Sequence, residues 1–210
     1  MRKFLLVAGL LASMAVYAEG NKVEVRAGFD FGSTFQHNYY DVSEDAKFSY
    51  ELGAEYRREL PYNLELGVGL AYQDHGKLKS KSNYRGSYSY TTEGDLYDSI
   101  PLYVTGRYNF KNSSEITPYV KVNLGYSINM NDGTMKLKYN DGSETNLDVD
   151  AKNGFYYGVG AGVTYKGFVA DLSYQANYSD VDFKQNGRTV ESSSADFNRV
   201  TLGLGYTFDF

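Results

Sequence analysis

The 210-residue sequence predicts an all-β chain, a transmembrane eight-stranded antiparallel up-and-down β-barrel that follows a cleaved signal peptide. Three observations lead to this prediction. The last residues alternate strictly between apolar and small or polar side chains, seven earlier segments repeat the alternation, and the gaps between segments are long and short in turn. Because side chains alternate between the two faces of a strand, each segment has one apolar face, as a lipid-exposed barrel wall requires.

The final segment, residues 200–210, carries the strongest signal. Its sequence VTLGLGYTFDF places Tyr206, Phe208 and Phe210 at the end of one apolar face, opposite threonines, glycines and Asp209. This ending resembles the closing strand of bacterial outer-membrane β-barrels, whose terminal aromatic residues are read by the barrel assembly machinery. The resemblance implies that the three aromatic residues form an assembly signal.

The first 18 residues have the parts of a secretory signal peptide. Arg2 and Lys3 give a positive start, residues 4–16 form an apolar stretch with Ser13 as its one polar residue, and a cleavage site follows between Ala18 and Glu19. Such a stretch is too short to cross a bilayer as a helix. We therefore expect residues 1–18 to be removed and residues 19–210 to form one barrel domain.

The composition argues against several classes of protein. Although 42% of the chain is hydrophobic, no segment after the signal peptide is long and apolar enough for a transmembrane helix. The chain has no Cys, so it forms no disulfide and carries no lipidated cysteine. Removal of Arg2 and Lys3 changes the net charge from −5 to −7, which gives no support to nucleic-acid binding.

Eight segments carry the alternation, and many of their apolar faces begin or end in Tyr or Phe, as expected of aromatic girdles at two membrane interfaces. The segments are 23–35, 48–56, 64–72, 100–110, 119–128, 155–165, 168–178 and 200–210. In the first, Phe35 is expected to share the outer face with Phe31. Pro101 conflicts with the pattern because it lacks an N–H, so we expect a bulge there or a ladder that begins just after it.

The gaps between these segments predict the topology. Long gaps at 36–47, 74–99, 129–153 and 179–199 alternate with short ones at 57–63, 111–116 and 166–167. All long loops then lie on one side of the membrane and all short turns on the other. In outer-membrane barrels the long loops are extracellular, so both termini are expected to be periplasmic.

The segment 100–110, IPLYVTGRYNF, resembles a strand of opacity-type outer-membrane proteins. Together with residues 204–210, it makes the whole mature chain similar to the small eight-stranded outer-membrane barrels, which include OmpX-like proteins, the transmembrane domain of OmpA and the opacity proteins. This resemblance implies the fold and a bacterial outer-membrane location. It implies little about activity, because the superfamily includes adhesins, structural proteins, narrow pores and a few lipid A enzymes.

The polar faces of the segments predict a barrel interior rich in paired charges. An eight-stranded barrel is just wide enough for side chains to fill it, and buried charges must be paired. We therefore expect an ion-pair network and not an open channel, with Asp209 also facing inward. The predicted members of the lumen network are Glu24, Arg26, Asp30, Glu51, Glu55, Arg57, Glu65, Arg107, Lys121, Asp171 and Arg199.

The sequence offers no candidate catalytic, cofactor or metal site. His37 and His75 are the two histidines, both expected at loop edges, and neither belongs to the H-x-S-N pattern of the lipid A deacylase barrels. The acidic residues of 141–150 do not follow the order of an EF-hand loop. We therefore expect a protein without enzymatic activity or cofactor.

Two long loops contain features of interest. Residues 135–149 read as a hairpin that turns at 140–142 and places Lys138 opposite Glu144. The loop 74–99 interleaves cations with tyrosines, an arrangement that can bind lipopolysaccharide phosphates or host glycans, although a solvated strand extension is the favoured explanation. Its candidate binding residues are Lys77, Lys79, Lys81, Tyr84, Arg85, Tyr88 and Tyr90.

These observations favour a monomeric, non-enzymatic outer-membrane barrel that supports the envelope and presents extracellular loops for adhesion or surface recognition. The expected partners are outer-membrane lipid and lipopolysaccharide, the barrel assembly machinery and cell-surface ligands of the loops. A narrow porin-like channel is the first alternative, and a lipid A-modifying enzyme is the second.

Overall fold

A computed structural model of the chain describes residues 20–37, 42–45, 48–78, 81–85, 88–130 and 133–210. The expected signal peptide, its cleavage site at Ala18 and Glu19, and Lys79 lie outside these residues. In the part of the chain that is described, no helix is long and apolar enough to cross a membrane.

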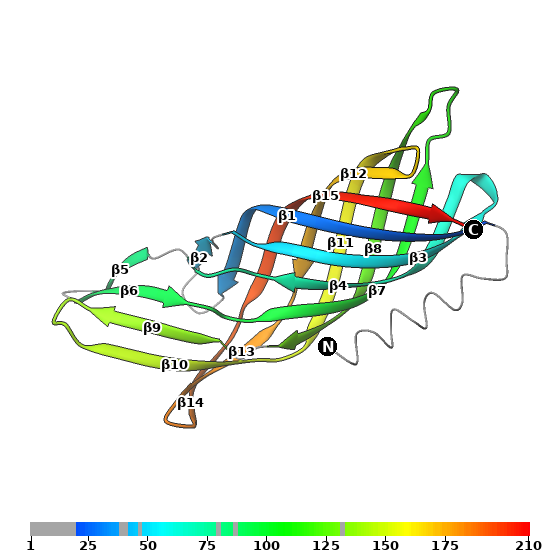
Figure 1. Ribbon diagram of the computed structural model, residues 1–210. Helices are drawn as coiled ribbons and strands as arrows, with labels where there is room; N and C mark the ends of the chain where they lie inside the picture. The colour runs from blue at the N-terminus through cyan, green and yellow to red at the C-terminus, as the bar shows by residue number, and fades with distance from the viewer. Residues whose placement is uncertain (1–19, 38–41, 46–47, 79–80, 86–87, 131–132) are drawn as a thin grey trace.

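Eight long strands close into an antiparallel barrel (Figure 1). Each pairs with the barrel strands before and after it, and the last strand returns to pair with the first from Lys22–Asp209 to Gln36–Asp196. The predicted all-β, eight-stranded barrel is therefore confirmed. Its strands are β1 (Asn21–His37), β3 (Tyr50–Leu60), β4 (Leu64–Asp74), β7 (Asp98–Asn109), β8 (Ile116–Met130), β11 (Gly154–Tyr165), β12 (Phe168–Asn177) and β15 (Asp196–Asp209).

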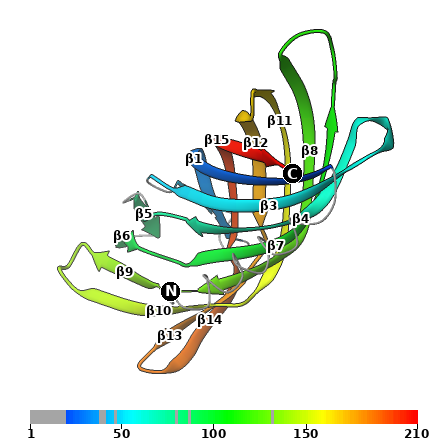
Figure 2. The ribbon, with the colours of Figure 1, turned by 45° about the vertical axis from the view of Figure 1, so that its right-hand side comes forward.

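Six shorter strands form a second sheet beyond one end of the barrel, here called the extension sheet (Figures 1 and 2). They are β5 (Lys81–Arg85), β6 (Tyr88–Gly94), β9 (Thr134–Tyr139), β10 (Glu144–Ala151), β13 (Asp180–Gln185) and β14 (Arg188–Ser194). Their spatial order, β14-β13-β10-β9-β6-β5, repeats that of the adjoining barrel strands, β15-β12-β11-β8-β7-β4. The extension sheet thus continues the barrel wall and stays open between β14 and β5.

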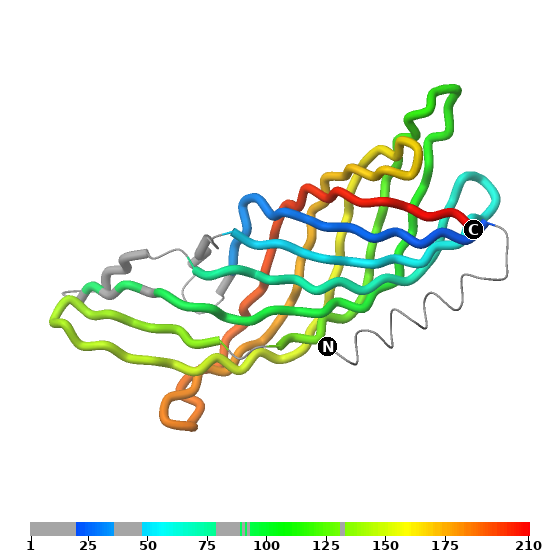
Figure 3. Tube along the Cα trace, viewed as in Figure 1, coloured from blue at the N-terminus to red at the C-terminus, as the bar shows by residue number. Residues whose placement is uncertain are grey.

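Short turns join the strands at the opposite end of the barrel, where the C-terminus also lies (Figure 3). We call this the turn end, and the other the sheet end. The turn between β11 and β12 is Lys166-Gly167, with φ of 49° and 85°. Both residues are left-handed, as a two-residue hairpin turn requires. The 3₁₀ turn η2 (Pro61–Asn63) joins β3 to β4, and β2 (Val42–Asp45) adds to the sheet end of β1.

The outer face of the barrel is apolar, the reverse of a soluble protein. Side chains such as Leu66, Val104 and Leu172 are about half exposed. Aromatic rings gather near both ends: Tyr157 stacks 6.0 Å from Tyr178 toward the sheet end, and Phe168 lies 5.1 Å from Tyr206 at the turn end. An apolar band between two aromatic belts is the surface that a bilayer covers.

Two expectations about single residues were wrong. Phe31 pairs with Val200 but Thr34 pairs with Asn198, so β1 contains a bulge at 32–33, where Gly32 has a φ of +62°. The extra residue reverses the alternation, and Phe35 faces inward, fully buried, instead of outward.

Pro101 lies within β7 and pairs with Ser127 of β8. The strand therefore has no bulge at Pro101, and the ladder with β8 does not begin after it. On the other side, the ladder between β4 and β7 lacks the pairs between Leu70–Leu102 and Gln73–Ser99, and its register is unchanged. A two-pair gap in the ladder therefore accommodates the missing N–H.

Candidate functional site

The barrel interior is a continuous polar network, arranged in layers along the barrel axis. In the layer nearest the turn end, Arg57 is the central cation. Its guanidinium donates to Glu24 at 2.7 Å, to Glu55 at 2.5 Å and to Glu65 at 2.8 Å. Glu24 also accepts from Arg107 at 3.3 Å. Strand alternation explains this convergence, because all five residues share the inner parity of β1, β3, β4 and β7.

A second layer centres on Asp171 of β12. Its carboxylate accepts from Arg26 at 2.6 and 3.1 Å, from Lys121 at 2.9 Å and from the Tyr119 hydroxyl at 3.0 Å. Arg26 also donates to Glu51, so it joins two carboxylates on opposite sides of the lumen. Gly203 and Gly162 make this possible, since a Cβ on Gly203 would lie 2.1 Å from the Arg26 side chain.

The third layer contains Arg199, which is fully buried. It donates to Glu51 at 3.1 Å and to Gln175 at 2.8 Å, and its Nη1 lies 3.5 Å from Asp30. Its Nε and Nη1 make no hydrogen bond within the described structure. Beyond it, Asn177 donates to neutral groups only, at 3.0 Å.

The structure brings together all eleven residues of the predicted lumen network, each with its side chain turned inward. Six carboxylates (Glu24, Asp30, Glu51, Glu55, Glu65, Asp171) face the five predicted cations, and Lys22 at the turn end completes the balance by donating to Glu65 at 2.7 Å. Asp209 is different: its side chain is 72% exposed and lies at the rim, 4.0 Å from Lys22. It pairs with Lys22 of β1 on the inner parity of β15, so it lines the open turn end of the lumen and lies outside the buried network.

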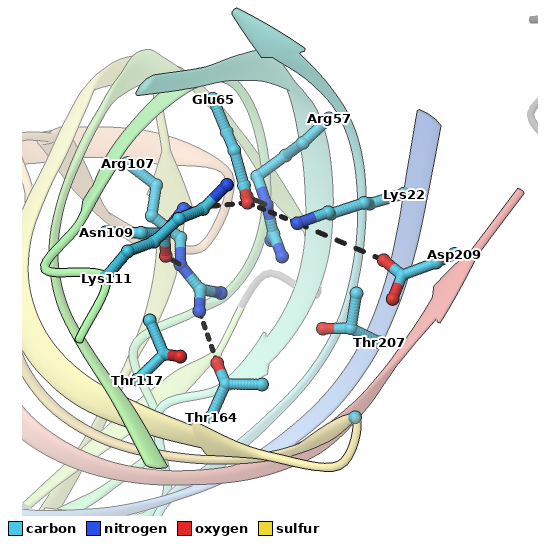
Figure 4. Close-up of a pocket in the computed structure, with 11 residues that line it drawn as sticks. Lys22, Arg57, Glu65, Arg107, Asn109, Lys111, Thr117, Thr164, Thr207 and Asp209 are labelled. Carbon is cyan, nitrogen blue, oxygen red and sulfur yellow. Dashed lines mark hydrogen bonds and ion pairs between the residues drawn. The ribbon is translucent and has the colours of Figure 1, made fainter. Parts of the chain in front are cut away.

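A pocket of about 120 Å³ opens into the network at the turn end (Figure 4). Arg57 and Glu65 form its floor, and Lys22, Lys111 and Asp209 lie around its mouth. Arg107 donates from its wall to the hydroxyl of Thr164. The pocket ends where the ion pairs begin, so it does not reach the sheet end.

The opposite end of the lumen is covered by a hydrophobic cluster that the sequence analysis did not foresee. We call it the apolar cap. Its buried members are Phe35, Leu78, Leu96, Tyr97, Val149, Val181, Phe183, Ala195 and Phe197. They come from β1, β10, β13, β15 and the connections beside β4 and β7, so the inner face of the barrel wall changes from polar to apolar as it continues into the extension sheet.

His75 lies at the boundary between the polar network and the apolar cap, and it is fully buried. Its expected place at an exposed loop edge was wrong, because the inward parity of Glu65 and Gln73 continues past the expected end of the segment at residue 72. Its Nε2 lies 3.0 Å from Ser99 Oγ. Both residues have no exposed surface, so this Ser–His pair is closed to a substrate. The side chain of His37 lies outside the described residues.

The candidate binding loop is only partly described. Lys77 is exposed and lies 3.9 Å from Asp95. The backbones of Lys81, Tyr84, Arg85, Tyr88 and Tyr90 belong to β5 and β6, whereas their side chains lie outside the described part. The predicted hairpin is present as β9 and β10, with Lys138 paired opposite Glu144. However, Lys138 binds Glu93 of β6 at 3.0 Å, because the neighbouring strand presents a closer carboxylate.

The hairpin of β13 and β14 was missed in the long gap 179–199. Its signal is the dipeptide Asn186-Gly187, whose φ values of 52° and 75° form the turn. Within the described residues, no group of three or more His, Asp or Glu side chains is placed to hold a metal ion. Tyr206 and Phe208 form a ring contact of 4.9 Å at the turn end, and Phe210 is exposed there. Their role in assembly stays a prediction.

Comparison with known proteins agrees with this architecture. A family model described as outer membrane protein beta-barrel domain matches residues 4–208. An uncharacterized protein of Pasteurella multocida (strain Pm70) is 28% identical over 204 residues, which cover 89% of this chain and 86% of that protein. Among solved structures, Neisserial surface protein A is 17% identical with a TM-score of 0.45, covering 90% of this chain and 98% of its own. OprG from Pseudomonas aeruginosa is 12% identical with a TM-score of 0.48, covering 91% and 98%.

Proposed function

Because the chain belongs to the outer membrane protein β-barrel family, we propose that it is a non-conducting barrel that displays the extension sheet at the cell surface for adhesion or recognition. The observation that carries this proposal is the contrast between the two parts. The lumen is filled by paired charges and covered by the apolar cap, whereas the extension sheet stands clear of the apolar band. In this proposal the barrel anchors the protein in the membrane and the extension sheet provides the binding surface.

The orientation follows from the loop lengths. The turn end carries the short connections and the described chain ends, which we assign to the periplasm, and the sheet end carries the long hairpins, which we assign to the exterior. The signal peptide at 1–18 would direct export, and the aromatic residues near 210 would guide insertion by the barrel assembly machinery. We propose a monomer, because each barrel strand already has two partners.

The outer face of the extension sheet carries lysine and carboxylate side chains in pairs. Lys138 binds Glu93 at 3.0 Å, and Lys152 lies 3.2 Å from Asp182. Such paired side chains are partly exposed and exchange partners at little cost. We propose that this face, with the cations and tyrosines of 77–90, contacts anionic glycans or lipopolysaccharide phosphates.

The narrow pore remains a second candidate because of the turn-end pocket. It requires a water path past Arg57 and then past the apolar cap, and both lie across the barrel axis. An enzymatic role is not proposed, since the buried pair of His75 and Ser99 has no access for a lipid substrate.

Topology and binding can be tested on the same cells. Trypsin added to intact cells should cut in the extension sheet, for example after Arg188, and should spare Lys166 and Arg58. Retention of the cells on a sulfated-glycan surface should fall at least threefold in the triple variant Lys77→Gln, Lys81→Gln and Arg85→Gln. The matched control, Lys166→Gln at the turn end, should bind like the wild type. Cutting at Lys166, or equal retention of all three strains, would refute the proposal.

A further inference from the structure

The imidazole of His75 is enclosed by aromatic rings. It stacks on Phe197 with ring centroids 4.0 Å apart and an interplanar angle of 17°. Tyr97 meets it edge-on at 4.9 Å, and Phe35 lies 6.1 Å away. These three rings are also members of the apolar cap, so His75 packs against the cap from the side of the polar network.

The Ser99 hydroxyl links His75 to the polar network of the lumen. Ser99 Oγ donates its only proton to Gln73 Oε1 at 3.0 Å and accepts from Asn177 at 3.0 Å. Ser99 Oγ also lies 3.0 Å from His75 Nε2. The other ring nitrogen, Nδ1, makes no hydrogen bond of normal geometry to the residues described.

No carboxylate among the described residues is placed to compensate an imidazolium at this position. From β15, the charge that acts on His75 is Arg199, which is positive, and Asp196 accepts from the Ser179 amide at 3.3 Å. From β1, Asp30 accepts from Thr201 at 2.6 Å and lies beside Arg199.

The carboxylates on the chain near His75 are also engaged. Asp98 of β7 accepts from the Tyr72 hydroxyl at 2.8 Å and from the His75 backbone N–H at 3.4 Å. Asp74 accepts from the Gly76 amide at 2.8 Å. Burial, with the positive charge of Arg199, holds the pKa of His75 well below its ordinary value, and the Tyr97 backbone opposes this shift.

We propose that His75 is an acid-sensitive latch: while neutral it fastens the apolar cap over the lumen, and when protonated it releases the cap. The geometry supports this because the His75 ring stacks on Phe197 in the apolar cap and contacts Ser99 in the polar network of the lumen. The buried ring has no carboxylate partner among the described residues, so a charged ring gains solvation by leaving the stack for water. Departure of the ring removes the stacked partner of Phe197 and the edge-on contact of Tyr97, which loosens the cap and opens the sheet end.

The size of the effect follows from proton linkage. In the released state the ring is solvated and has an ordinary pKa of roughly 6.5, so the released population rises about tenfold for each pH unit below that value. Between pH 7.5 and pH 5.0 the expected increase is about 30-fold.

Amide hydrogen exchange of the refolded protein in lipid vesicles measures this population. The reporters are the amides of Val149 and Ala195, which bond to Gly133 O at 2.9 Å and Ser179 O at 2.7 Å inside the cap. After correction for intrinsic exchange, their opening constants should rise about 30-fold at pH 5.0 in the wild type. His75→Gln, which keeps a neutral hydrogen-bonding side chain, should show less than a threefold change. His37→Gln, the matched control, should keep the full increase.

A flat wild-type profile, an acid response retained in His75→Gln, or a response lost in His37→Gln would each overturn the latch. If His75→Gln fails to fold, NMR of the wild type with labelled histidine carries the test. The ring of His75 should be neutral at pH 7.5, and its protonation should coincide with loss of amide protection in the cap. Protonation without that loss would also overturn it.

Discussion

Arg57→Met is the perturbation that examines the lumen network most sharply. Arg57 is 1% exposed and bridges three carboxylates, which would then depend on their other partners. Glu24 keeps Arg107 and Thr207, and Glu65 keeps Lys22 and Asn109.

Glu55 is the residue that this substitution affects most, because it loses its ion pair and keeps the neutral Tyr103 hydroxyl at 3.1 Å and the more distant charges of Lys121 and Arg26. An unpaired buried charge costs about 3–5 kcal/mol. We therefore expect Arg57→Met to lower the free energy of unfolding by about that amount, measured by urea titration in lipid vesicles with circular dichroism. The double variant Arg57→Met/Glu55→Gln should regain at least half of the loss, since the orphaned charge is gone.

The control is Lys166→Met, which removes a surface pair with Glu115 at 3.3 Å whose side chains are both more than half exposed. Such a pair contributes at most about 1 kcal/mol. A loss below about 1 kcal/mol in Arg57→Met, equal to that of the control, would refute a dry and paired lumen. The same result would indicate that water reaches the charges and screens them.

Three further predictions follow from other parts of the molecule. Gly67→Ala should strongly reduce the yield of refolded barrel on heat-modifiability gels, because the new Cβ would lie 1.9 Å from the Tyr56 carbonyl oxygen. The control Gly142→Ala meets open space and should lower the free energy of unfolding by about 1–2 kcal/mol through its φ of +84°. Gly187→Val should abolish the β13–β14 hairpin, read as loss of amide protection in 180–194 with the barrel intact, because Gly187 has a φ of +75°. The Ser192 hydroxyl and Lys152 lower the pKa of Asp182 in the folded protein. The stability that Asp182 gives the hairpin is therefore present above the ordinary carboxyl pKa and is lost as the pH falls through the folded pKa. Amide hydrogen exchange in 180–194 should rise between pH 5 and pH 3 in the wild type and not in Asp182→Asn.

The barrel was predictable because its information is local. Each strand carries its own inside–outside alternation, and the parity of residues such as Glu24, Arg57 and Arg107 fixes the face that they occupy. For Arg57, the sequence predicted that its charge is paired inside the barrel, but it did not predict which three carboxylates are its partners. The particular partners depend on the register between neighbouring strands, for example Arg57 opposite Gly67, which no single segment contains.

The remaining features depend on irregularities and on lateral contacts. The bulge at Gly32 reverses the face of Phe35, and a count by two cannot detect an inserted residue. The extension sheet arises from pairing between hairpins distant in sequence, such as β10 with β13. His75 was misjudged because its segment was ended at the last apolar residue, although its inner parity continued.

The most direct test of the filled barrel is the single-channel conductance of the refolded, unmutated protein in a planar bilayer at neutral pH. The ion pairs around Arg57 and Asp171 and the apolar cap cross the lumen in series. We therefore predict no current steps above baseline in 1 M KCl. Steady steps whose size grows in proportion to salt concentration would contradict the account and favour a narrow pore.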